Sequence, residues 1–325
     1  MINFSTDDFR PHERFDHWCE VRARNLFGVT ISLDPRHRAH FRGRFSAVSV
    51  SDSILSNMRA SPYLVSRGAG DISRTSSDSL CIYQQTGGAS WFNSKGEGEF
   101  TIAAGELAIS HSDLPYTTAP TTAHGFDLRI LKIPLAGREM FARPARGLPP
   151  ALLRDNPRLK MAIAASLAAL AASATENPDA DFDQDVGHLA QLALLARNRV
   201  APGSPESRAA LRSGVLKAAT SVLAQNLHRP GLSPLAVATE LGISVRQLHL
   251  LFEPTGRSFA RTLMALRLTE ARRVMLGVMS TRPVADVAYA CGFDSMATFY
   301  RVFRQTYGMT PNELRAEKIA ADVTL

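Results

Sequence analysis

Basic and hydrogen-bonding side chains gather on the outer faces of two short predicted helices in the last third of the chain. These outer positions are Arg246, Gln247, His249 and Leu250 on the first helix, and Met296, Ala297, Thr298, Tyr300, Arg301 and Arg304 on the second. An arginine side chain can donate two parallel hydrogen bonds to the edge of a guanine, and it also binds phosphate. The chemistry that these residues suggest is contact with double-stranded DNA through base edges and backbone.

The segment around the second of these helices carries the signals that would position it. Pro283 suits the start of a preceding helix, and Gly292 suits the left-handed position that ends it. Ser295 can cap the next helix, Gly308 can end it, and Thr310-x-x-Glu313 is a capping box for a third helix. The buried side of the middle helix is expected to consist of Phe299, Val302 and Phe303.

The same pattern occurs fifty residues earlier in the chain. Ser233-Pro234 opens a helix, and Ser244-x-x-Gln247 is a capping box for the next one. The matching pairs are Ala238 with Ala288, Gly242 with Gly292, Ile243 with Phe293 and, after one extra residue in the second copy, Phe252 with Phe303. Two helices around a glycine-containing turn, present twice, predict helix-turn-helix units at residues 233–252 and 283–303.

A predicted helix from Ser258 to Leu276 joins the two copies and contains neither Gly nor Pro. Its apolar face is expected to consist of Phe259, Leu263, Leu266, Ala271, Val274 and Met275. At 1.5 Å per residue it would be a rod of roughly 28 Å. One turn of DNA spans about 34 Å, so a rod of this length can hold two recognition helices about one turn apart within a single chain.

Positive charge is concentrated in this part of the molecule. Residues 213–318 contain 13 Lys and Arg against 7 Asp and Glu, a net charge of +6 out of +7 for the whole chain. A phosphate-binding surface needs such a concentration. The alternatives are an ordinary helical hairpin and a solvated basic domain, and the duplication of the motif favours DNA binding over both.

The C-terminal third resembles the AraC/XylS family of bacterial transcription regulators. The resemblance covers residues 215–316 and is carried by SFARTLMALRLTEARRVM and DVAYACGFDSMATFYRVFRQTYGMTPNELR. It implies that the second helix of each unit enters the major groove. The implied base contacts are Arg246, His249 and Leu250 in the first unit and Met296, Ala297, Thr298 and Arg301 in the second. Leu250 departs from the pattern, because an Arg is common there, and this weakens the expected base reading by the first unit.

Short alternating runs from Phe41 to Pro134, separated by Gly, Ser and Asp, predict a β-sandwich or a small barrel. The family resemblance implies a cupin-like sensor barrel, which binds a small effector in some relatives. The residues expected to line such a site are Tyr83, Trp91, Phe92 and Phe100. The alternative is that these aromatic residues are plain core.

Helices are expected on both sides of the barrel segment, at residues 12–27, 157–174 and 182–197. The last two would cover the barrel, and the resemblance implies that they also pair two protomers into a homodimer. The Pro- and Gly-containing stretch from Ala201 predicts a linker at residues 201–212, between a sensing or dimerisation domain (1–200) and a DNA-binding domain (213–325). The expected fold class is α+β: a β-rich barrel with flanking helices, then an all-α domain with two helix-turn-helix units.

Several functional classes are disfavoured by what the sequence lacks. Three scattered cysteines without a C-x-x-C pair argue against a disulfide framework or a zinc site. Among the histidines, His37, His40, His111 and His124 form no metal-ligand pattern, so no cofactor is expected. No nucleophile elbow or paired acid and base indicates an enzyme. No apolar run suggests a membrane span, and the N-terminus does not read as a signal peptide, so a cytoplasmic location is expected.

The sequence therefore predicts a DNA-binding regulator, with a small-molecule effector and RNA polymerase as expected further partners. Two alternatives remain open at this point. The N-terminal part could serve only for dimerisation or polymerase contact, or it could be an enzyme fused to a DNA-binding domain. The three scattered cysteines argue against an alkyl-transfer repair enzyme, which would need a reactive cysteine cluster.

Overall fold

The computed structural model describes residues 2–21, 27–154, 156–277 and 282–323, with side chains described up to Glu317. It divides into two compact units, residues 1–214 and 215–325, each with its own hydrophobic core. The division falls within helix α6 (Pro205–Asn226).

The predicted linker at 201–212 is irregular only in its first part, because α6 begins at Pro205. A proline at the first helical position loses no hydrogen bond, since the N–H that it lacks would have no partner there. The Oγ of Ser204 accepts a hydrogen bond from the backbone N–H of Ser207 at 3.1 Å, which caps the helix. The prolines and serines that suggested a break therefore start a helix instead.

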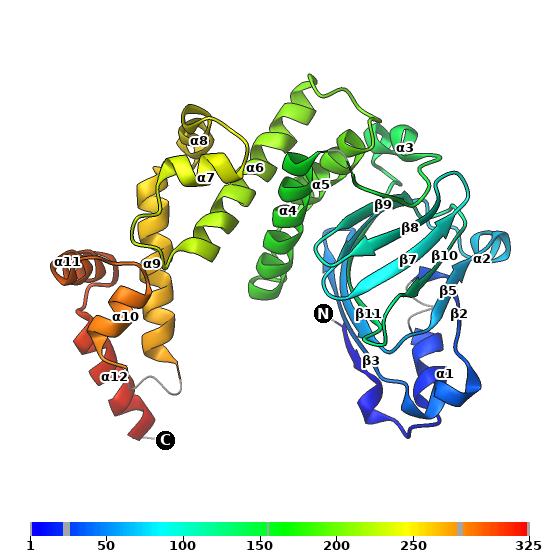
Figure 1. Cartoon of the computed structure of the whole chain (residues 1–325), viewed down its shortest axis with the longest axis horizontal. Helices are drawn as coiled ribbons and strands as arrows, with labels where there is room; N and C mark the ends of the chain where they lie inside the picture. Colours follow the sequence, from blue (N-terminus) through cyan, green and yellow to red (C-terminus); the bar gives the residue numbers. More distant parts are fainter. Residues whose placement is uncertain (1, 22–26, 155, 278–281, 324–325) are drawn as a thin grey trace. The chain divides into compact units, whose positions relative to one another are not determined.

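Two antiparallel sheets form the N-terminal unit (Figure 1). The larger sheet has the order β1 (Ile2–Ser5), β3 (Gly43–Val50), β4 (Ser53–Ala60), β11 (Phe126–Pro134), β6 (Ser79–Gln85), β9 (Leu107–His111) and β12 (Ala151–Leu152). The smaller sheet has the order β2 (Thr30–Ser32), β5 (Leu64–Arg67), β10 (Tyr116–Pro120), β7 (Ala89–Ser94) and β8 (Gly98–Ala103). The predicted β-rich fold of this region is confirmed.

An aromatic-rich core lies between the two sheets. Its largest members are Phe15, Trp18, Phe41, Phe45, Tyr63, Tyr83, Phe92, Phe100 and Phe126. Phe15 and Trp18 come from helix α1 (Arg14–Trp18), which continues as π-helix over residues 19–21; residues 22–26 of the helix predicted for 12–27 lie outside the described residues. A further short helix, α2 (Ala69–Arg74), follows β5.

Helices α3 (Glu139–Ala145), α4 (Pro157–Glu176) and α5 (Asp183–Ala196) cover the outer face of the larger sheet. Leu80 and Ile82 of β6 alternate with the interior residues Cys81 and Tyr83, and all four are buried. A strand whose two faces are both buried must be covered on both sides. The predicted helices at 157–174 and 182–197 correspond to α4 and α5.

Helix α4 differs from the expectation that no segment has the apolarity of a membrane span. Its 20 residues are long and apolar enough to cross a membrane by length and composition. However, Leu159, Ile163, Leu167 and Leu170 lie on one side and are buried, as in a core helix that packs on its neighbours.

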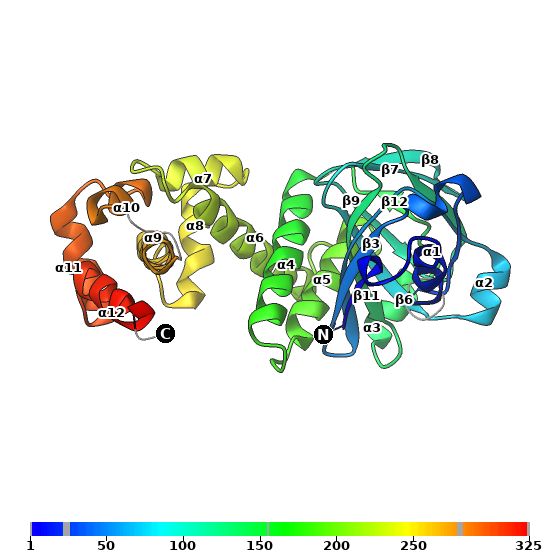
Figure 2. The same ribbon diagram turned by 90° about the horizontal axis from the view of Figure 1, so that it is seen from below.

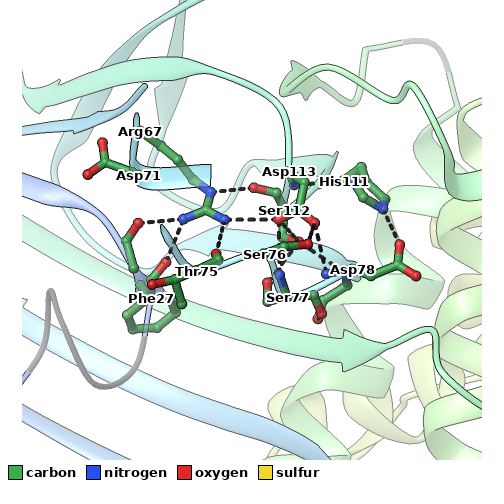
Figure 3. A network of polar contacts seen from close by, with 12 residues as sticks. Phe27, Arg67, Asp71, Thr75, Ser76, Ser77, Asp78, His111, Ser112 and Asp113 are labelled. Carbon is green, nitrogen blue, oxygen red and sulfur yellow. Dashed lines mark hydrogen bonds and ion pairs between the residues drawn. The ribbon is translucent and has the colours of Figure 1, made fainter. Parts of the chain in front are cut away.

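A polar network joins three loops at one end of the barrel (Figure 3). The side chain of Arg67 is 2% exposed and donates to the backbone oxygens of Ser112 (2.5 Å), Phe27 (3.2 Å) and Thr75 (2.8 Å). It also donates to Oδ1 of Asp113 at 2.9 Å. Every direction of the buried guanidinium is thus used to hold backbone together, which assigns Arg67 a structural role.

Asp113 completes this network by accepting hydrogen bonds from Ser76, Ser77 and Asp78. Burial opposes its ionisation, but these hydrogen bonds and the one from Arg67 outweigh it and hold the pKa of Asp113 well below its usual range. At neutral pH, Arg67 and Asp113 are therefore both charged and form an ion pair within this network.

The C-terminal unit is helical. After α6 it contains α7 (Pro234–Glu240), α8 (Val245–Phe252), the 3₁₀ turn η4 (Glu253–Thr255), α9 (Phe259–Leu276), α10 (Val284–Ala290), α11 (Met296–Tyr307) and α12 (Pro311–Val323). The predicted linking helix is α9, and Ser258 caps it through a hydrogen bond from Arg261 N at 3.3 Å. Its 18 residues make a rod of about 27 Å.

Helix α9 lies between the two helix-turn-helix pairs. In Figure 2 it is seen end-on, with α8 on one side and α10 to α12 on the other. Near its start, Phe259 meets Phe252 of α8 edge-on at 6.2 Å between ring centroids. Its second half contributes Leu268, Ala271 and Met275 to a core shared with α10, α11 and α12. One helix thus supports both pairs.

Candidate nucleic-acid interface

The turn of the first helix-turn-helix is built around Gly242. Its φ of +62° lies in the left-handed region, which glycine adopts without a steric cost. Its backbone N–H donates to Thr239 O at 3.1 Å, and the next N–H, of Ile243, donates to Ala238 O at 3.0 Å. These two bonds satisfy carbonyls that the end of α7 would otherwise leave open.

The turn of the second helix-turn-helix repeats this geometry fifty residues later. Gly292 has a φ of +82° and donates to Tyr289 O at 2.9 Å, while Phe293 N donates to Ala288 O at 3.1 Å. The sequence repeat therefore corresponds to a structural repeat of the same turn.

Side-chain caps fix the starts of α8 and α11. Ser244 Oγ accepts from Gln247 N at 3.1 Å, and Gln247 Oε1 accepts from Ser244 N at 2.9 Å, so the predicted capping box is present. Ser295 Oγ accepts from Thr298 N at 3.3 Å. These caps fix the first turns of α8 and α11, which carry Arg246 and Ala297.

Helix α8 presents its candidate residues to solvent. Arg246, Gln247 and His249 are exposed, and Leu250 is 40% exposed. The inner side of the helix consists of Leu248 and Phe252. The side-chain carbonyl of Gln247 is already used by the capping box, so its amide N–H groups are what it can offer to a base.

Helix α11 presents a narrower outer face than predicted. Ala297, Arg301 and Arg304 are exposed, whereas Thr298 is partly buried. Met296 and Tyr300 are partly buried against the core that contains Phe299 and Phe303. Val302 was expected in the core and is only partly buried. The exposed candidates on this helix are therefore Ala297 and the two arginines.

Arg267 of α9 is a functional candidate that the sequence pattern did not single out. It is 8% exposed and lies among the buried residues of the helix. Its position, four residues after Leu263 and four before Ala271, was the available signal, because i, i+4 and i+8 share one helix face. Leu266, assigned to that face from the sequence, is only partly buried.

The barrel residues proposed to line a ligand site are only partly brought together. The rings of Phe92 and Phe100 stack with centroids 5.5 Å apart, and Tyr83 lies 6.3 Å from Phe92. Trp91 lies on the opposite face of β7, half-buried and outside the interior core. Consecutive strand residues face opposite sides, so Trp91 and Phe92 could not both point inward.

Among the described residues, the titratable side chains form neither a metal site nor a reactive thiol. No three His, Cys, Asp or Glu side chains within it lie together as metal ligands would. Cys291 is 3% exposed in the core of the second helix-turn-helix, and burial raises its pKa to about 11. Burial also raises the pKa of Cys81. Neither thiol has the depressed pKa of a reactive cysteine.

Family models match most of the chain. One described as an AraC-binding-like domain matches residues 18–198, and one described as a helix-turn-helix domain matches residues 237–317. Among solved structures, the AraC-like transcriptional activator CuxR covers 89% of this chain and 99% of its own, with a TM-score of 0.50 and 19% identity. This last likeness is one of fold.

Characterised relatives match over the C-terminal part. The transcriptional activator NphR of Rhodococcus sp is 36% identical over 96 residues, which are 30% of this chain and 28% of the relative. The transcriptional activator RhrA of Rhizobium meliloti (strain 1021) is 32% identical over 97 residues, 30% of this chain and 31% of the relative. The matched segment thus spans about a third of each relative's length.

Proposed function

The chain belongs to the AraC/XylS family of bacterial transcription regulators, and we propose that it acts as one by inserting α8 and α11 into the major groove of DNA. The observation that supports this most is the repeated turn. Gly242 and Gly292 have the same geometry, and each is followed by a capped helix with exposed arginine on its outer face. A repeated unit of this kind, in the part of the chain that carries most of the positive charge, is suited to reading two half-sites.

Helices α8 and α11 would contribute unequally to base recognition. Arg301 and Arg304 of α11 and Arg246 of α8 are the exposed side chains that can make bidentate contacts to guanine or bind phosphate. His249, Thr298 and the amide of Gln247 would add single hydrogen bonds. Ala297 and Leu250 would make apolar contacts, for instance to a thymine methyl group.

The N-terminal unit would supply control by a small effector. Tyr83, Phe92 and Phe100 already pack together, so a ligand that contacts them enters beside the cluster rather than into an empty interior. A hollow of about 500 Å³ lies next to Phe100, with Arg154, Arg197 and Glu97 among its lining residues. This hollow offers a place for a small polar effector.

A second candidate role for the N-terminal unit follows from the same core. Phe92 and Phe100 are 2% and 7% exposed, so these two proposed lining residues are packed as core residues. Such packing favours a unit that only pairs protomers through α4 and α5 or contacts RNA polymerase. DNA binding that no metabolite alters would favour this second role.

The relatives NphR and RhrA are named as activators, and we extend that role to this chain. It would then act in the cytoplasm, as a homodimer paired through α4 and α5, and would contact RNA polymerase at its promoter. Light scattering tests the dimer: a monomer at micromolar concentration would exclude it.

Selection of DNA from a random pool by the full-length protein tests the central proposal. We expect an enriched sequence with two half-sites about one helical turn apart. Binding to this sequence should weaken steeply with salt, because phosphate contacts release counterions. Enrichment of no sequence, or binding without salt dependence, would contradict DNA recognition.

A further inference from the structure

Arg267 lies at a junction of three chain segments inside the C-terminal unit. Its side chain leaves the middle of α9, and the residue is 8% exposed. Nε donates to Leu227 O at 2.9 Å, and Nη2 donates to Arg229 O at 2.6 Å and to Pro230 O at 3.4 Å. All three acceptors are backbone carbonyls just after the end of α6.

These carbonyls belong to the turn that leads into the first helix-turn-helix. Within it, Arg229 N bonds to Asn226 O at 3.0 Å and Leu232 N to Arg229 O at 3.2 Å. The next residue, Ser233, caps α7. By holding this turn, Arg267 fixes the entry of the first helix-turn-helix against the middle of α9.

The second helix-turn-helix meets the same junction through Gly292. A Cβ added there would overlap the carbonyl oxygen of Leu227 and would lie 2.9 Å from Nε of Arg267. The turn between α10 and α11 therefore rests directly on the carbonyl that Arg267 holds. One buried side chain thus touches the entry of the first helix-turn-helix and the turn of the second.

The chemistry of the junction requires arginine. A guanidinium is planar and offers several N–H donors in fixed directions, so it can serve separate carbonyls at once. A lysine ammonium is a compact charge on a flexible stem and cannot hold this geometry. Burial lowers the pKa of Arg267, and the nearby charge of Asp294 partly offsets this, but an arginine stays charged at any physiological pH.

We propose that Arg267 is the positioning residue that fixes the two helix-turn-helix pairs relative to each other and thereby sets the spacing of the half-sites that the protein reads. This rests on the proposed DNA-binding function. Two readers held rigidly gain affinity only for DNA whose half-sites match their separation, whereas a loose connection accepts several spacings with less gain.

The test uses the full-length protein and the two-half-site fragment that the wild-type protein enriches from a random pool. Derivatives carry two extra base pairs between the half-sites, which rotates one half-site by about 70° relative to the other. The wild-type protein should lose about 100-fold in affinity on insertion, because a rigid pair can then engage one half-site only.

Arg267→Met should bind the original fragment about tenfold more weakly and lose less than about threefold on insertion. Its affinity for a fragment with one half-site should stay close to that of the wild-type protein, a result that general unfolding would not give. Arg267→Lys keeps the charge and should relax the spacing preference partly. Arg273→Gln is the matched control, because Arg273 is an exposed arginine of the same helix, paired with Glu270 at 2.6 Å.

Circular dichroism shows which variants are folded, and only folded variants are used in the binding test. If Arg267→Met does not fold, Arg267→Lys carries the test. If a folded Arg267 variant loses as much affinity on insertion as the wild-type protein, the positioning role is overturned. The same holds if the wild-type protein loses no affinity on insertion. A wild-type protein that enriches no DNA would instead overturn the DNA-binding function itself, and this proposal with it.

Discussion

The two helix-turn-helix pairs share a turn but differ in what surrounds it. Gly242 and Gly292 have φ values of +62° and +82° and equivalent hydrogen bonds. A Cβ on Gly242 would meet no atom within 4 Å among the described residues, whereas one on Gly292 would overlap Leu227 O. The first turn is thus exposed, and the second is packed into the domain. A repeated local motif can therefore serve two different tertiary roles.

The two recognition helices differ in the same direction. Helix α11 has 12 residues and exposes two arginines, Arg301 and Arg304, whereas α8 has 8 residues and exposes one, Arg246, with Leu250 also on its outer face. The second pair, whose turn is packed into the domain, thus also exposes more arginines on its recognition helix. We infer that the second pair supplies most of the sequence preference and the first mainly adds affinity.

The largest expected contrast is between Gly292→Ala and Gly242→Ala. Gly242→Ala only places an alanine at a left-handed φ and should destabilise the protein by about 1–2 kcal/mol. Gly292→Ala adds a backbone clash and should destabilise it by about 4 kcal/mol or more, within the range of severe overpacking and strain. Urea unfolding of both variants, followed by circular dichroism, measures the difference.

Cys291 provides a control for where the Gly292→Ala damage occurs. Its thiol is buried and has a pKa of about 11, so iodoacetamide should react slowly with the native protein. Gly292→Ala should speed modification of Cys291 but not of Cys81 in the barrel, as peptide mass spectrometry would show. Equal destabilisation by the two glycine variants would contradict the packed-turn interpretation.

The next contrast is between Arg301→Ala and Arg246→Ala. Loss of a bidentate arginine–guanine contact should reduce discrimination between specific and random DNA by about 1–3 kcal/mol, and the effect should be larger for Arg301. Fluorescence anisotropy with the selected site and with a scrambled site gives both affinities. An equal loss on both DNAs would assign Arg301 to phosphate contact instead.

Leu250→Arg should make the first pair more like the second. An arginine at this 40% exposed position could reach a base edge or a phosphate and should strengthen binding by about 1 kcal/mol. Leu250→Gln is the matched control, since it adds polarity without charge. No gain with arginine would indicate that α8 does not approach the groove at this position.

The smallest expected contrast is in pH dependence. Glu313 accepts a hydrogen bond from Thr310 N at 2.6 Å at the start of α12, and this bond holds the pKa of Glu313 below its usual value. Because the folded pKa is depressed, this contribution is present above the unfolded pKa of about 4.3 and is lost as pH falls through the folded value. The capping box of the first pair uses the neutral Gln247 and does not titrate.

Hydrogen exchange of backbone amides between pH 6 and pH 3 would show this difference. After correction for the intrinsic pH dependence of exchange, protection at the start of α12 should fall on acidification, while that at the start of α8 should stay constant. Glu313→Gln should remove the pH dependence at α12. A parallel loss at both helix starts would point to unfolding of the whole unit.

The sequence by itself determined the features that depend on residues a few positions apart. The two turns, the capping boxes at Ser244 and Thr310, the extent of α9 and the alternation of β3 all follow from local hydrogen bonds and side-chain period. Such features need no knowledge of the rest of the chain, because both partners lie within one turn of helix or one strand.

Only the tertiary structure decided which residues meet across the chain. Arg267 and Leu227 are 40 residues apart, and nothing local shows that this arginine turns inward to hold a carbonyl. The face of β7 that carries Trp91 was likewise set by packing. A buried polar group is stable only where distant segments supply its partners, so its position is a property of the assembled fold.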